Sequence, residues 1–516
     1  MKAALEKKLV FATAFCEGLC VLVVEIAGAR ALAPYYGSSL RVWTSQITAT
    51  LLFLALGYGL GGRLSRKAGN WKLGLSFWVA GLWLALYPFL RTGVLSFTSA
   101  HAGVAGGSLL SAALLFGLPL LCLGAVSPLL IARLGAIEAG AGQAAGSLFF
   151  VNTLGGLAGG WLTALVLIPH LPLRLSLAGC GIFLALLGSF WGLLLRPKSK
   201  ASAIAAPLTA LALVFMSPSP SLSLDLGGIA SKVDYRQSSG VGLIEVIDVG
   251  PYGRSLMIDG VTQGGMSKET GTSVYEFTEY LNFLSHRYHP HAKSALLLGL
   301  GSGLLAKQLV LRGLSVTAAE VEPTMEAVAR DWFDMPAAVR VIPEDGRAWL
   351  NRTDEKYDLV FLDAFAGENA PWYLTTKEAM AQIKRCLNPG GRLLINSVAR
   401  PQGSEGLKRL EANIMEAFGE GLVFLEAPHD AQKSDLINAT LLAGVALKVS
   451  TEKFPSKVFQ RIEPKLMELT EHVRPAVASN LVMTDDACDL DYAESPLRLE
   501  WRKLVIEVLG PKILTD

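Results

Sequence analysis

The sequence ALLLGLGSGLLAKQLVLRG occupies residues 295–313 and largely decides the fold of the second half of the chain. Its first six residues are apolar and predict a short buried strand. The segment 299–303 is rich in glycine and predicts a tight turn, and the amphipathic residues after it predict a helix. Such a turn lets the backbone approach a ligand closely and leaves amide groups free at the start of the helix. The stretch therefore predicts a ligand-binding turn in an α/β domain.

Strands and helices alternate on both sides of this turn. Further strands are predicted within 315–323, 339–350, 357–365 and 391–398, with helical segments between them. This alternation predicts a parallel, doubly wound sheet.

A smaller unit is expected before the turn. Segments 241–249 and 255–259 predict two strands joined by a turn, and 273–286 predicts a helix. These segments indicate a small β-domain ahead of the α/β domain.

Acidic residues follow three of the predicted strands. Glu320 ends the second strand, about 20 residues after the glycine turn, where an acid can accept hydrogen bonds from both ribose hydroxyls. Asp345 and Gly346 end the third strand, in the place for an adenine amino contact, and Asp363 ends the fourth at the carboxyl edge. Each acid alone could merely cap a helix or face water. Three in register behind a glycine turn favour nucleoside binding.

A dinucleotide-binding enzyme would share these features, but its turn usually carries a third glycine. Here Leu304 stands three positions after Gly301. The pattern therefore favours S-adenosylmethionine or a close relative as the ligand.

The first half of the chain is strongly apolar. Of the 516 residues 51% are hydrophobic and only 17% are charged, and charged residues are sparse before residue 225. Apolar stretches near 20 residues predict membrane spans at about 9–33, 43–62, 73–90, 107–132, 144–168 and 175–195. A cleaved signal peptide is the alternative for the first stretch, but the five later ones need no leader.

Basic residues predict the orientation of these spans. Lysine and arginine gather before the first span and after the second, fourth and sixth, whereas the alternate loops carry only Arg41, Arg91 and Arg174. The positive-inside rule therefore places the N-terminus and the segment after residue 195 in the cytoplasm. A seventh charge-free stretch, 201–224, is interpreted as a re-entrant or interfacial element. As a true span it would place the C-terminal domain outside.

Polar residues and small residues also occur within the predicted spans. Glu25 and Arg30 lie in the first span and Asn152 in the fifth, where charged and polar groups are costly and often functional. The alternative is that Arg30 snorkels and Glu25 pairs with it or faces a neighbouring helix. Gly57 and Gly61, four residues apart, favour close packing of helices.

Composition excludes several other classes of protein. The net charge of +2 says nothing about nucleic acid, but no run of basic residues suggests a track for a phosphate backbone, so nucleic acid is not expected as a partner. The six cysteines include no CxxC pair, which favours a reducing compartment over a disulfide framework. Three histidines fall within 286–291, but no further ligand is placed to complete a metal site, so no metal is expected.

The motifs of the second half resemble the spermidine and spermine synthase family of polyamine aminopropyltransferases, and more closely its bacterial members fused to a membrane domain. The resemblance covers about 235–425. Five elements of the family occur here in order. The element L-x-DG-xx-Q corresponds to Leu256, Asp259, Gly260 and Gln263, and the glycine turn corresponds to Gly299, Gly301 and Gly303. The element E-x-D-P corresponds to Glu320, Val321, Glu322 and Pro323, the element DG to Asp345 and Gly346, and the element YD…D to Tyr357, Asp358 and Asp363.

The resemblance implies a reaction and a set of site residues. An amine attacks the aminopropyl group of decarboxylated S-adenosylmethionine, methylthioadenosine leaves, and Asp363 is the base that accepts the ammonium proton. The implied nucleoside-binding residues are Gln263, Gly299, Gly301, Gly303, Glu320, Asp345 and Gly346. The implied substrate-binding residues are Tyr275, Asp363 and Phe365.

Two departures from the family pattern bear on the substrate. Soluble members carry D-E-xx-Y-x-E after the glutamine, but here 271–277 read GTSVYEF and only Tyr275 stays in place. The lost aspartate normally grips the amine of the donor. The D-xx-D-P element has become DAFAG at 363–367, which loses an acid that helps to hold a polyamine and introduces Phe365.

Three functions therefore stay open. The first is aminopropyl transfer with an altered acceptor. The second is another reaction of S-adenosylmethionine, either methyl transfer or cleavage or cyclisation of the aminocarboxypropyl chain. The third is a nucleoside-sensing membrane protein without catalysis.

The sequence thus predicts a multi-pass α-helical membrane domain (1–224), a small β-domain (225–290), a Rossmann-like, doubly wound α/β domain of methyltransferase type (291–450) and a C-terminal helical extension (451–516). The expected location is the bacterial inner membrane, with the soluble domain in the cytoplasm. The expected ligands are S-adenosylmethionine or its decarboxylated form, and a small amine or no acceptor. The lipid bilayer is a further partner, and a homodimer stays open.

Overall fold

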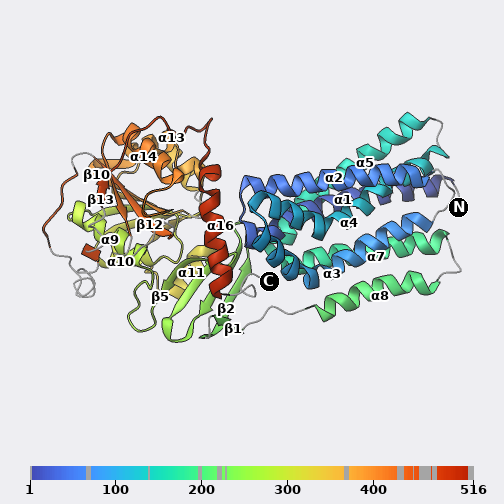
Figure 1. Ribbon diagram of the computed structural model, residues 1–516, viewed down its shortest axis with the longest axis horizontal. Helices are drawn as coiled ribbons and strands as arrows, with labels where there is room; N and C mark the ends of the chain where they lie inside the picture. Colours follow the sequence, from blue (N-terminus) through green and yellow to red (C-terminus); the bar gives the residue numbers. More distant parts are fainter. Residues whose placement is uncertain are drawn as a thin grey trace. The chain divides into compact units, whose positions relative to one another are not determined.

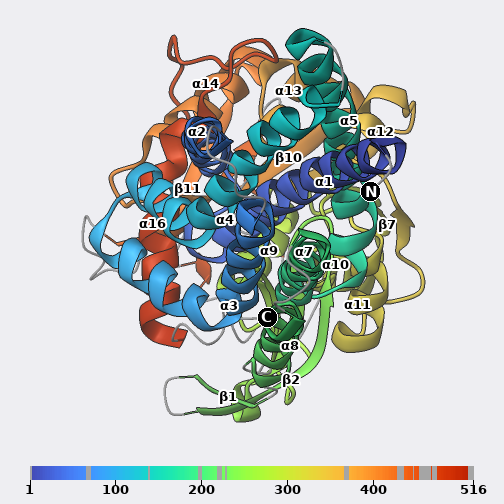
Figure 2. The ribbon, with the colours of Figure 1, turned by 90° about the vertical axis from the view of Figure 1, so that its right-hand side faces the viewer.

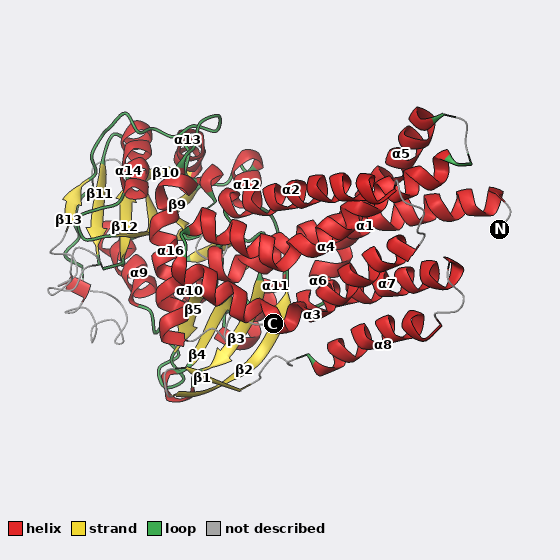
Figure 3. Cartoon of the chain, turned by 45° about the vertical axis from the view of Figure 1, so that its right-hand side comes forward, coloured by secondary structure: helices red, strands yellow, loops and turns green. Residues whose placement is uncertain are grey.

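A computed structural model describes residues 3–65, 71–137, 140–195, 200–217, 223–226, 229–364, 371–426, 435–444, 447–452, 466–467 and 473–509. The chain forms two compact units (Figure 1). The first comprises 1–221 with 238–240 and 510–516, and the second comprises 222–237 with 241–509. The first is built of helices, whereas strands occur only in the second within the described residues (Figure 3).

The first unit is a bundle of long apolar helices. They are α1 (Ala3–Tyr36), α2 (Leu40–Ser65), α3 (Trp71–His101), α4 (Val104–Gly135), α5 (Ala141–Leu162) continued by the π-helical turn η1 (Thr163–Leu167) and α6 (Ile168–His170), α7 (Leu173–Leu195) and α8 (Lys200–Met216). Among the described residues, six helices are long and apolar enough to cross a membrane. They correspond to the six predicted spans.

Small residues let these helices pack closely, as the sequence predicts for Gly57 and Gly61. A Cβ atom added at Gly57 would lie 2.3 Å from the Leu121 carbonyl oxygen, and one at Gly61 would lie 2.4 Å from the Ala125 carbonyl oxygen. Both distances are shorter than van der Waals contact, so only glycine allows α2 to pack this closely on α4.

The seventh stretch forms the helix α8, which lies lengthwise against the bundle. Ala210 of α8 packs with Ala85 of α3 and Ala185 of α7 (Figures 1 and 2). Because α8 follows α7 directly and packs beside it, the two helices run antiparallel. The described part of 201–224 is therefore a helix that lies along the bundle, and its interpretation as a re-entrant or interfacial element stays a prediction.

A buried carboxylate inside the bundle was not recognised in the sequence. Glu17 of α1 is 1% exposed and accepts hydrogen bonds from Ser127 Oγ of α4, at 3.0 and 2.9 Å, and from Asn152 Nδ2 of α5, at 2.9 Å. The polar residue Asn152 therefore has a partner on another helix. The contact fixes three helices against one another.

The second unit begins with a five-stranded sheet. Its strands follow the chain in order: β1 (Ser223–Leu226), β2 (Ile229–Ser238), β3 (Leu243–Asp248), β4 (Arg254–Ile258) and β5 (Val261–Met266). The hairpin between β4 and β5 turns on Asp259 and Gly260, whose φ angles are 48° and 75°. Two positive φ angles characterise a type I′ turn, which explains the Asp-Gly pair at this position.

The larger sheet has eight strands in the order β13-β11-β12-β10-β9-β6-β7-β8. They are β6 (Ser294–Leu298), β7 (Ser315–Ala319), β8 (Arg340–Ile342), β9 (Tyr357–Leu362), β10 (Leu387–Ala399), β11 (Gly421–Leu425), β12 (Ile437–Ala443) and β13 (Val473–Pro475). The five strands from β8 to β10 are parallel, as predicted. The three strands at the other edge pair antiparallel, so the sheet is mixed.

Helices cover both faces of the larger sheet. Alternate residues of β9 separate into two cores: Leu359 and Phe361 pack with α9 (Glu276–Tyr288) and α10 (Leu304–Leu311), whereas Val360 and Leu362 pack on the opposite face. The opposite face is covered by α12 (Gly346–Arg352), α13 (Lys377–Cys386) and α14 (Glu405–Phe418). Another helix, α11 (Thr324–Phe333), packs with α10 against the small sheet.

The segment predicted as a helical extension has two roles in the second unit. It contains the helix α16 (Leu490–Leu509), and it also supplies β13 to the edge of the larger sheet. Much of 451–516 lies outside the described residues.

Candidate active site

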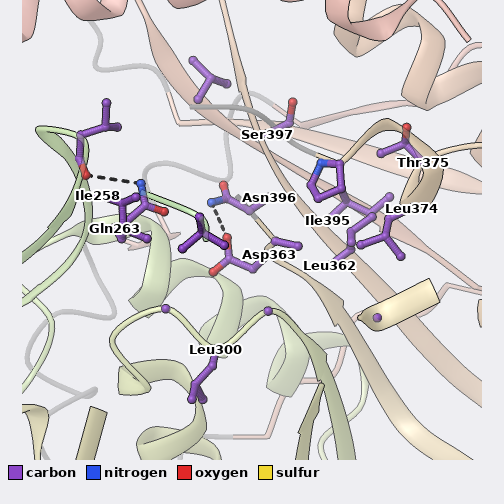
Figure 4. A pocket seen from close by; sticks show the side chains of 18 of the residues that line it. Ile258, Gln263, Leu300, Leu362, Asp363, Leu374, Thr375, Ile395, Asn396 and Ser397 are labelled. Carbon is purple, nitrogen blue, oxygen red and sulfur yellow. Dashed lines mark hydrogen bonds between the residues drawn. The ribbon is translucent and has the colours of Figure 1, made fainter. Parts of the chain in front are cut away.

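A cavity of about 580 Å³ lies at the carboxyl ends of the parallel strands (Figure 4). This volume is in the range of small-molecule binding sites. The strand order changes direction between β6 and β9, and ligands of such sheets bind at this switch point. Most of the predicted site residues line the cavity: Gln263, Tyr275, Gly299, Gly301, Glu320, Asp345, Gly346 and Asp363.

Two predicted residues are not among the lining residues. Gly303 is the N-cap of α10 with a φ angle of 71°, and a Cβ atom there would lie 2.9 Å from Ala329 Cβ and Met335 Sδ. The absence of a side chain at Gly303 therefore lets α10 pack closely against Ala329 and Met335. Phe365 lies outside the described residues.

The glycine turn follows β6 and touches the end of β9. Gly299 has a φ angle of 96°, and a Cβ atom there would lie 2.5 Å from the Asp363 carbonyl oxygen. The amide of Asp363 donates to the Leu298 carbonyl at 3.1 Å. The absence of a side chain at Gly299 thus lets the turn and Asp363 share one wall of the cavity.

Gly299→Ala should therefore abolish measurable nucleoside binding, whereas Gly313→Ala should not. Both glycines have a positive φ angle, 96° and 90°, so both variants carry similar backbone strain, about 1–2 kcal/mol. Only Gly299 has a backbone neighbour within reach, because nothing lies within 4 Å of a Cβ atom at Gly313. Calorimetry with methylthioadenosine and thermal unfolding separate the two effects. An equal loss of binding in both variants would show that the close approach of Gly299 to the Asp363 backbone is not what binding requires.

Glu320 stands at the end of β7 and is tied to the glycine turn. Its Oε2 accepts a hydrogen bond from the Leu300 amide and its Oε1 from the Glu322 amide, both at 2.9 Å. Burial raises the pKa of this carboxyl, and the amide hydrogen bonds oppose the shift. Each carboxylate oxygen has a second lone pair, so Glu320 can still accept hydrogen bonds from two hydroxyls.

Asp345 both lines the cavity and caps a helix. Its Oδ1 accepts hydrogen bonds from the amides of Arg347 and Ala348 at 2.9 and 3.1 Å, at the start of α12. Its Oδ2 accepts from the Tyr373 hydroxyl at 2.8 Å. Asp345 therefore does cap a helix, which was the alternative considered for each of the three acids. Tyr373 was not predicted because it comes from a separate short helix, η3 (Trp372–Leu374).

Asp363 is held by an asparagine of the neighbouring strand. Asn396 Nδ2 donates to Asp363 Oδ1 at 2.9 Å (Figure 4). Burial raises the pKa of Asp363, and the hydrogen bond from Asn396 opposes the shift. The other amide atom, Asn396 Oδ1, is buried and makes no hydrogen bond within the described residues. Sequence reasoning missed Asn396. Asn396 could have been found from the strand register. It directly follows Ile395, which pairs with Leu362, and Leu362 directly precedes Asp363.

The small sheet and α16 complete the cavity. Gln263 on β5 and Tyr275 at the N-cap of α9 line it. A Cβ atom at Gly264 would lie 2.3 Å from Ser302 Oγ, so glycine lets β5 approach the glycine turn. Glu494 and Trp501 of α16 also line the cavity. Nothing in the sequence pattern links α16 to the site.

The lining is acidic. It includes the four carboxyl groups of Glu320, Asp345, Asp363 and Glu494. No lysine, arginine or histidine is among the lining residues that the structure describes. Within the same described residues, no group of three or more His, Cys, Asp and Glu side chains is placed to hold a metal ion. The cavity therefore suits a cationic ligand.

Comparisons with known proteins agree with this arrangement. Residues 296–395 match the family model described as a methyltransferase domain. A probable polyamine aminopropyl transferase of Bifidobacterium longum is 34% identical over 135 residues, which are 25% of this chain and 30% of that protein. A polyamine aminopropyltransferase of Thermoplasma volcanium is 27% identical over 38% of this chain and 71% of its own length.

Solved structures are similar to part of the chain. A probable spermidine synthase from Corynebacterium glutamicum is 21% identical, with a TM-score of 0.37, over 48% of this chain and 90% of that chain. The chain spans less than a third of the length of the first curated relatives that it matches. The second half of the chain is thus related in sequence to the polyamine aminopropyltransferases, and the resemblance to the spermidine and spermine synthase family is confirmed.

Proposed function

We propose that the cavity binds decarboxylated S-adenosylmethionine and that the protein transfers its aminopropyl group to an amine. The observation that carries this proposal is the acidic lining, which contains four carboxyl groups and no described basic residue. The decarboxylated donor carries a sulfonium and an ammonium group and no carboxylate. The intact donor carries a carboxylate as well, which an acidic lining without a cation disfavours.

The residues fit the parts of this donor. Glu320 would accept hydrogen bonds from the ribose hydroxyls, and the backbone of the glycine turn would lie against the nucleoside. Gln263 and Tyr275 would approach it from the small sheet and α9. Asp345 is engaged by its helix and Tyr373, so we assign it a positioning role at the adenine end.

The reaction forms one bond and breaks one. The lone pair of the amine nitrogen attacks the methylene carbon beside the sulfonium, and the carbon–sulfur bond breaks. Its electron pair stays on sulfur, so methylthioadenosine leaves as a neutral thioether. The new ammonium group loses one proton to Asp363, which burial makes a stronger base than an exposed carboxylate.

A second candidate function is methyl transfer, because the matched family model is a methyltransferase domain. Product analysis separates the two. The full chain in detergent is incubated with each donor, with and without putrescine, and the products are identified by mass spectrometry. Aminopropyl transfer yields methylthioadenosine and an extended amine, whereas S-adenosylhomocysteine would establish methyl transfer. Nucleoside binding without any product would support a sensor.

We also propose that the first unit lies in a cell membrane with its N-terminus in the cytoplasm, on the evidence of the six apolar helices and the positions of the basic residues. The sequence predicts that the second unit is cytoplasmic, because six crossings of the membrane return the chain to the side of its N-terminus. The packing of α8 along α3 and α7 instead supports a seventh crossing. The 17 residues of α8 are about 25 Å long, which is the lower end of the range for a helix that spans a membrane.

Reporter fusions test this topology. A reporter fused after Leu195 should be active in the cytoplasm, and one fused after Leu226 should be active on the opposite side of the membrane. The donor and the amine would then have to reach the cavity from that side. Cytoplasmic activity of both fusions would restore six crossings and a cytoplasmic second unit.

A further inference from the structure

Four polar side chains form a chain of hydrogen bonds between α9 and α10. Arg312 Nη1 donates to Asn282 Oδ1 at 2.7 Å, and Asn282 Nδ2 donates to Gln308 Oε1 at 3.0 Å. Gln308 Nε2 in turn donates to Glu279 Oε1. An arginine side chain can only donate hydrogen bonds, so Arg312 fixes the direction of every bond in the chain. Glu279, which is buried, is therefore the final acceptor.

Glu279 also holds the turn that precedes α9. Its Oε1 accepts a hydrogen bond from the Ser273 amide at 3.3 Å. Ser273 Oγ accepts from the Tyr275 amide at 3.1 Å and donates to the Tyr275 carbonyl at 3.0 Å. Tyr275 lines the cavity, whereas Glu279 is not among the lining residues. The position of one wall of the cavity thus depends on an acid that lies behind it.

This turn lies where the sequence departs from the family pattern, because 271–277 read GTSVYEF in place of D-E-xx-Y-x-E. One link between the turn and α10 is the chain that ends at Glu279. Another is Lys307 Nζ, which donates to the Gly271 carbonyl at 3.1 Å. The helix α10 begins directly after the glycine turn. The glycine turn and Tyr275, which are two walls of the cavity, are therefore attached to the same helix.

We propose that Glu279 is a positioning residue that holds Tyr275 at the wall of the cavity. It acts through the Ser273 amide on one side and through Gln308 of α10 on the other. The inference rests on the proposed binding of a nucleoside in the cavity, because the position of Tyr275 then sets the affinity for that ligand. Glu279 itself makes no contact with the ligand in this proposal.

The charge of Glu279 should control this contact. Burial raises the pKa of Glu279 to about 7, and the hydrogen bonds from Gln308 and Ser273 oppose the shift. The pKa in the folded protein is therefore above the ordinary value of 4.5. The stability that the neutral carboxyl gives to the packed turn is complete below pH 4.5 and is lost as the pH rises through about 7.

The surroundings of Glu279 do not compensate a negative charge on it. Its Oε2 is buried and makes no hydrogen bond within the described residues. In the same part of the chain, no ion pair joins it to a charged side chain of the neighbouring elements. The ionisable side chains of these elements are Lys268 and Glu269 of the turn, Glu276 and His286 of α9, and Lys307 and Arg312 of α10. The carboxylate form should therefore loosen the turn.

Calorimetry with methylthioadenosine at pH 6 and pH 8 tests the inference, with the full chain in detergent. With a pKa of about 7, the neutral fraction of Glu279 falls about 10-fold between these two pH values, so the wild-type Kd should rise about 10-fold. Glu279→Gln copies the neutral carboxyl. Its Kd should equal the wild-type value at pH 6 and be about 10-fold lower than the wild-type value at pH 8.

Two further variants and a second measurement separate positioning from a general effect on folding. Ser273→Ala should raise the Kd at both pH values and keep the wild-type ratio between them, because it removes the hydroxyl that holds Tyr275 and leaves Glu279 in place. Glu326→Gln on α11, outside the cavity, should behave like the wild type. In thermal unfolding, Glu279→Gln should match the wild type at pH 6 and exceed it at pH 8.

The same pH dependence of Kd in Glu279→Gln as in the wild type would overturn the role given to Glu279. A lower unfolding temperature of this variant at pH 8 would do so as well, because it would show that the carboxylate stabilises the turn. If the folded wild type binds methylthioadenosine at neither pH, the proposed nucleoside site itself fails and the inference falls with it.

Discussion

Asp363→Asn is expected to lower the rate of aminopropyl transfer by about 10²–10⁴-fold, the usual contribution of a general base. The amide has the shape of the carboxylate and can keep the contact with Asn396, so nucleoside affinity should stay near the wild-type value. Single-turnover kinetics give the rate of transfer, and calorimetry with methylthioadenosine gives the affinity. The largest effect should therefore fall on the chemical step.

Asp358→Asn is the matched control for this variant. Asp358 stands near the start of the same strand, where it accepts hydrogen bonds from the amides of Lys293 and Ser294 at 2.7 and 3.1 Å. It does not line the cavity, so its loss can affect stability but not the chemical step. Amine-dependent turnover that survives in Asp363→Asn would remove this residue from the role of base and leave the reaction standing.

Glu320→Ala should weaken nucleoside binding by about 1.5–3 kcal/mol, or roughly 10- to 150-fold in Kd, the range for hydrogen bonds to a charged group. The variant also leaves the amides of Leu300 and Glu322 without an acceptor, so the upper part of this range is expected. Calorimetry with methylthioadenosine measures the effect. Glu326→Gln serves as the control, because Glu326 pairs with Arg330 on α11 outside the cavity. Unchanged affinity in Glu320→Ala would mean that the ribose lies elsewhere.

The glycine turn and the acids at the strand ends could be predicted from the sequence because they depend on local patterns. An apolar run predicts a strand, and parallel strands place their carboxyl ends at one edge. Gly299, Glu320 and Asp363 therefore lie together, as expected. The same reasoning could not predict that the Asp345 carboxylate accepts a hydrogen bond from Tyr373 as well as from amides of its own helix. The contact with Tyr373 depends on a side chain from a later turn of the chain.

The antiparallel edge of the sheet could not be predicted in the same way. The order of β11, β12 and β13 is not the order of the chain, so the sequence does not show that Glu426 and Thr440 lie beside Asn396. In the membrane half, apolar length revealed the helices, but Glu17 was overlooked as the partner of Asn152, 135 residues away. The apolar length of 201–224 also could not show that α8 lies along the bundle. In each case packing between distant segments decides the contact.

The most direct test of the proposed function is the initial rate of methylthioadenosine release from decarboxylated S-adenosylmethionine as the concentration of 1,4-diaminobutane is raised. The full chain in detergent is used at a saturating concentration of donor. Aminopropyl transfer predicts a rate that is low without amine, rises with amine and saturates, with one extended amine formed for each methylthioadenosine released. A rate that does not depend on amine, or S-adenosylhomocysteine as the product, would contradict it.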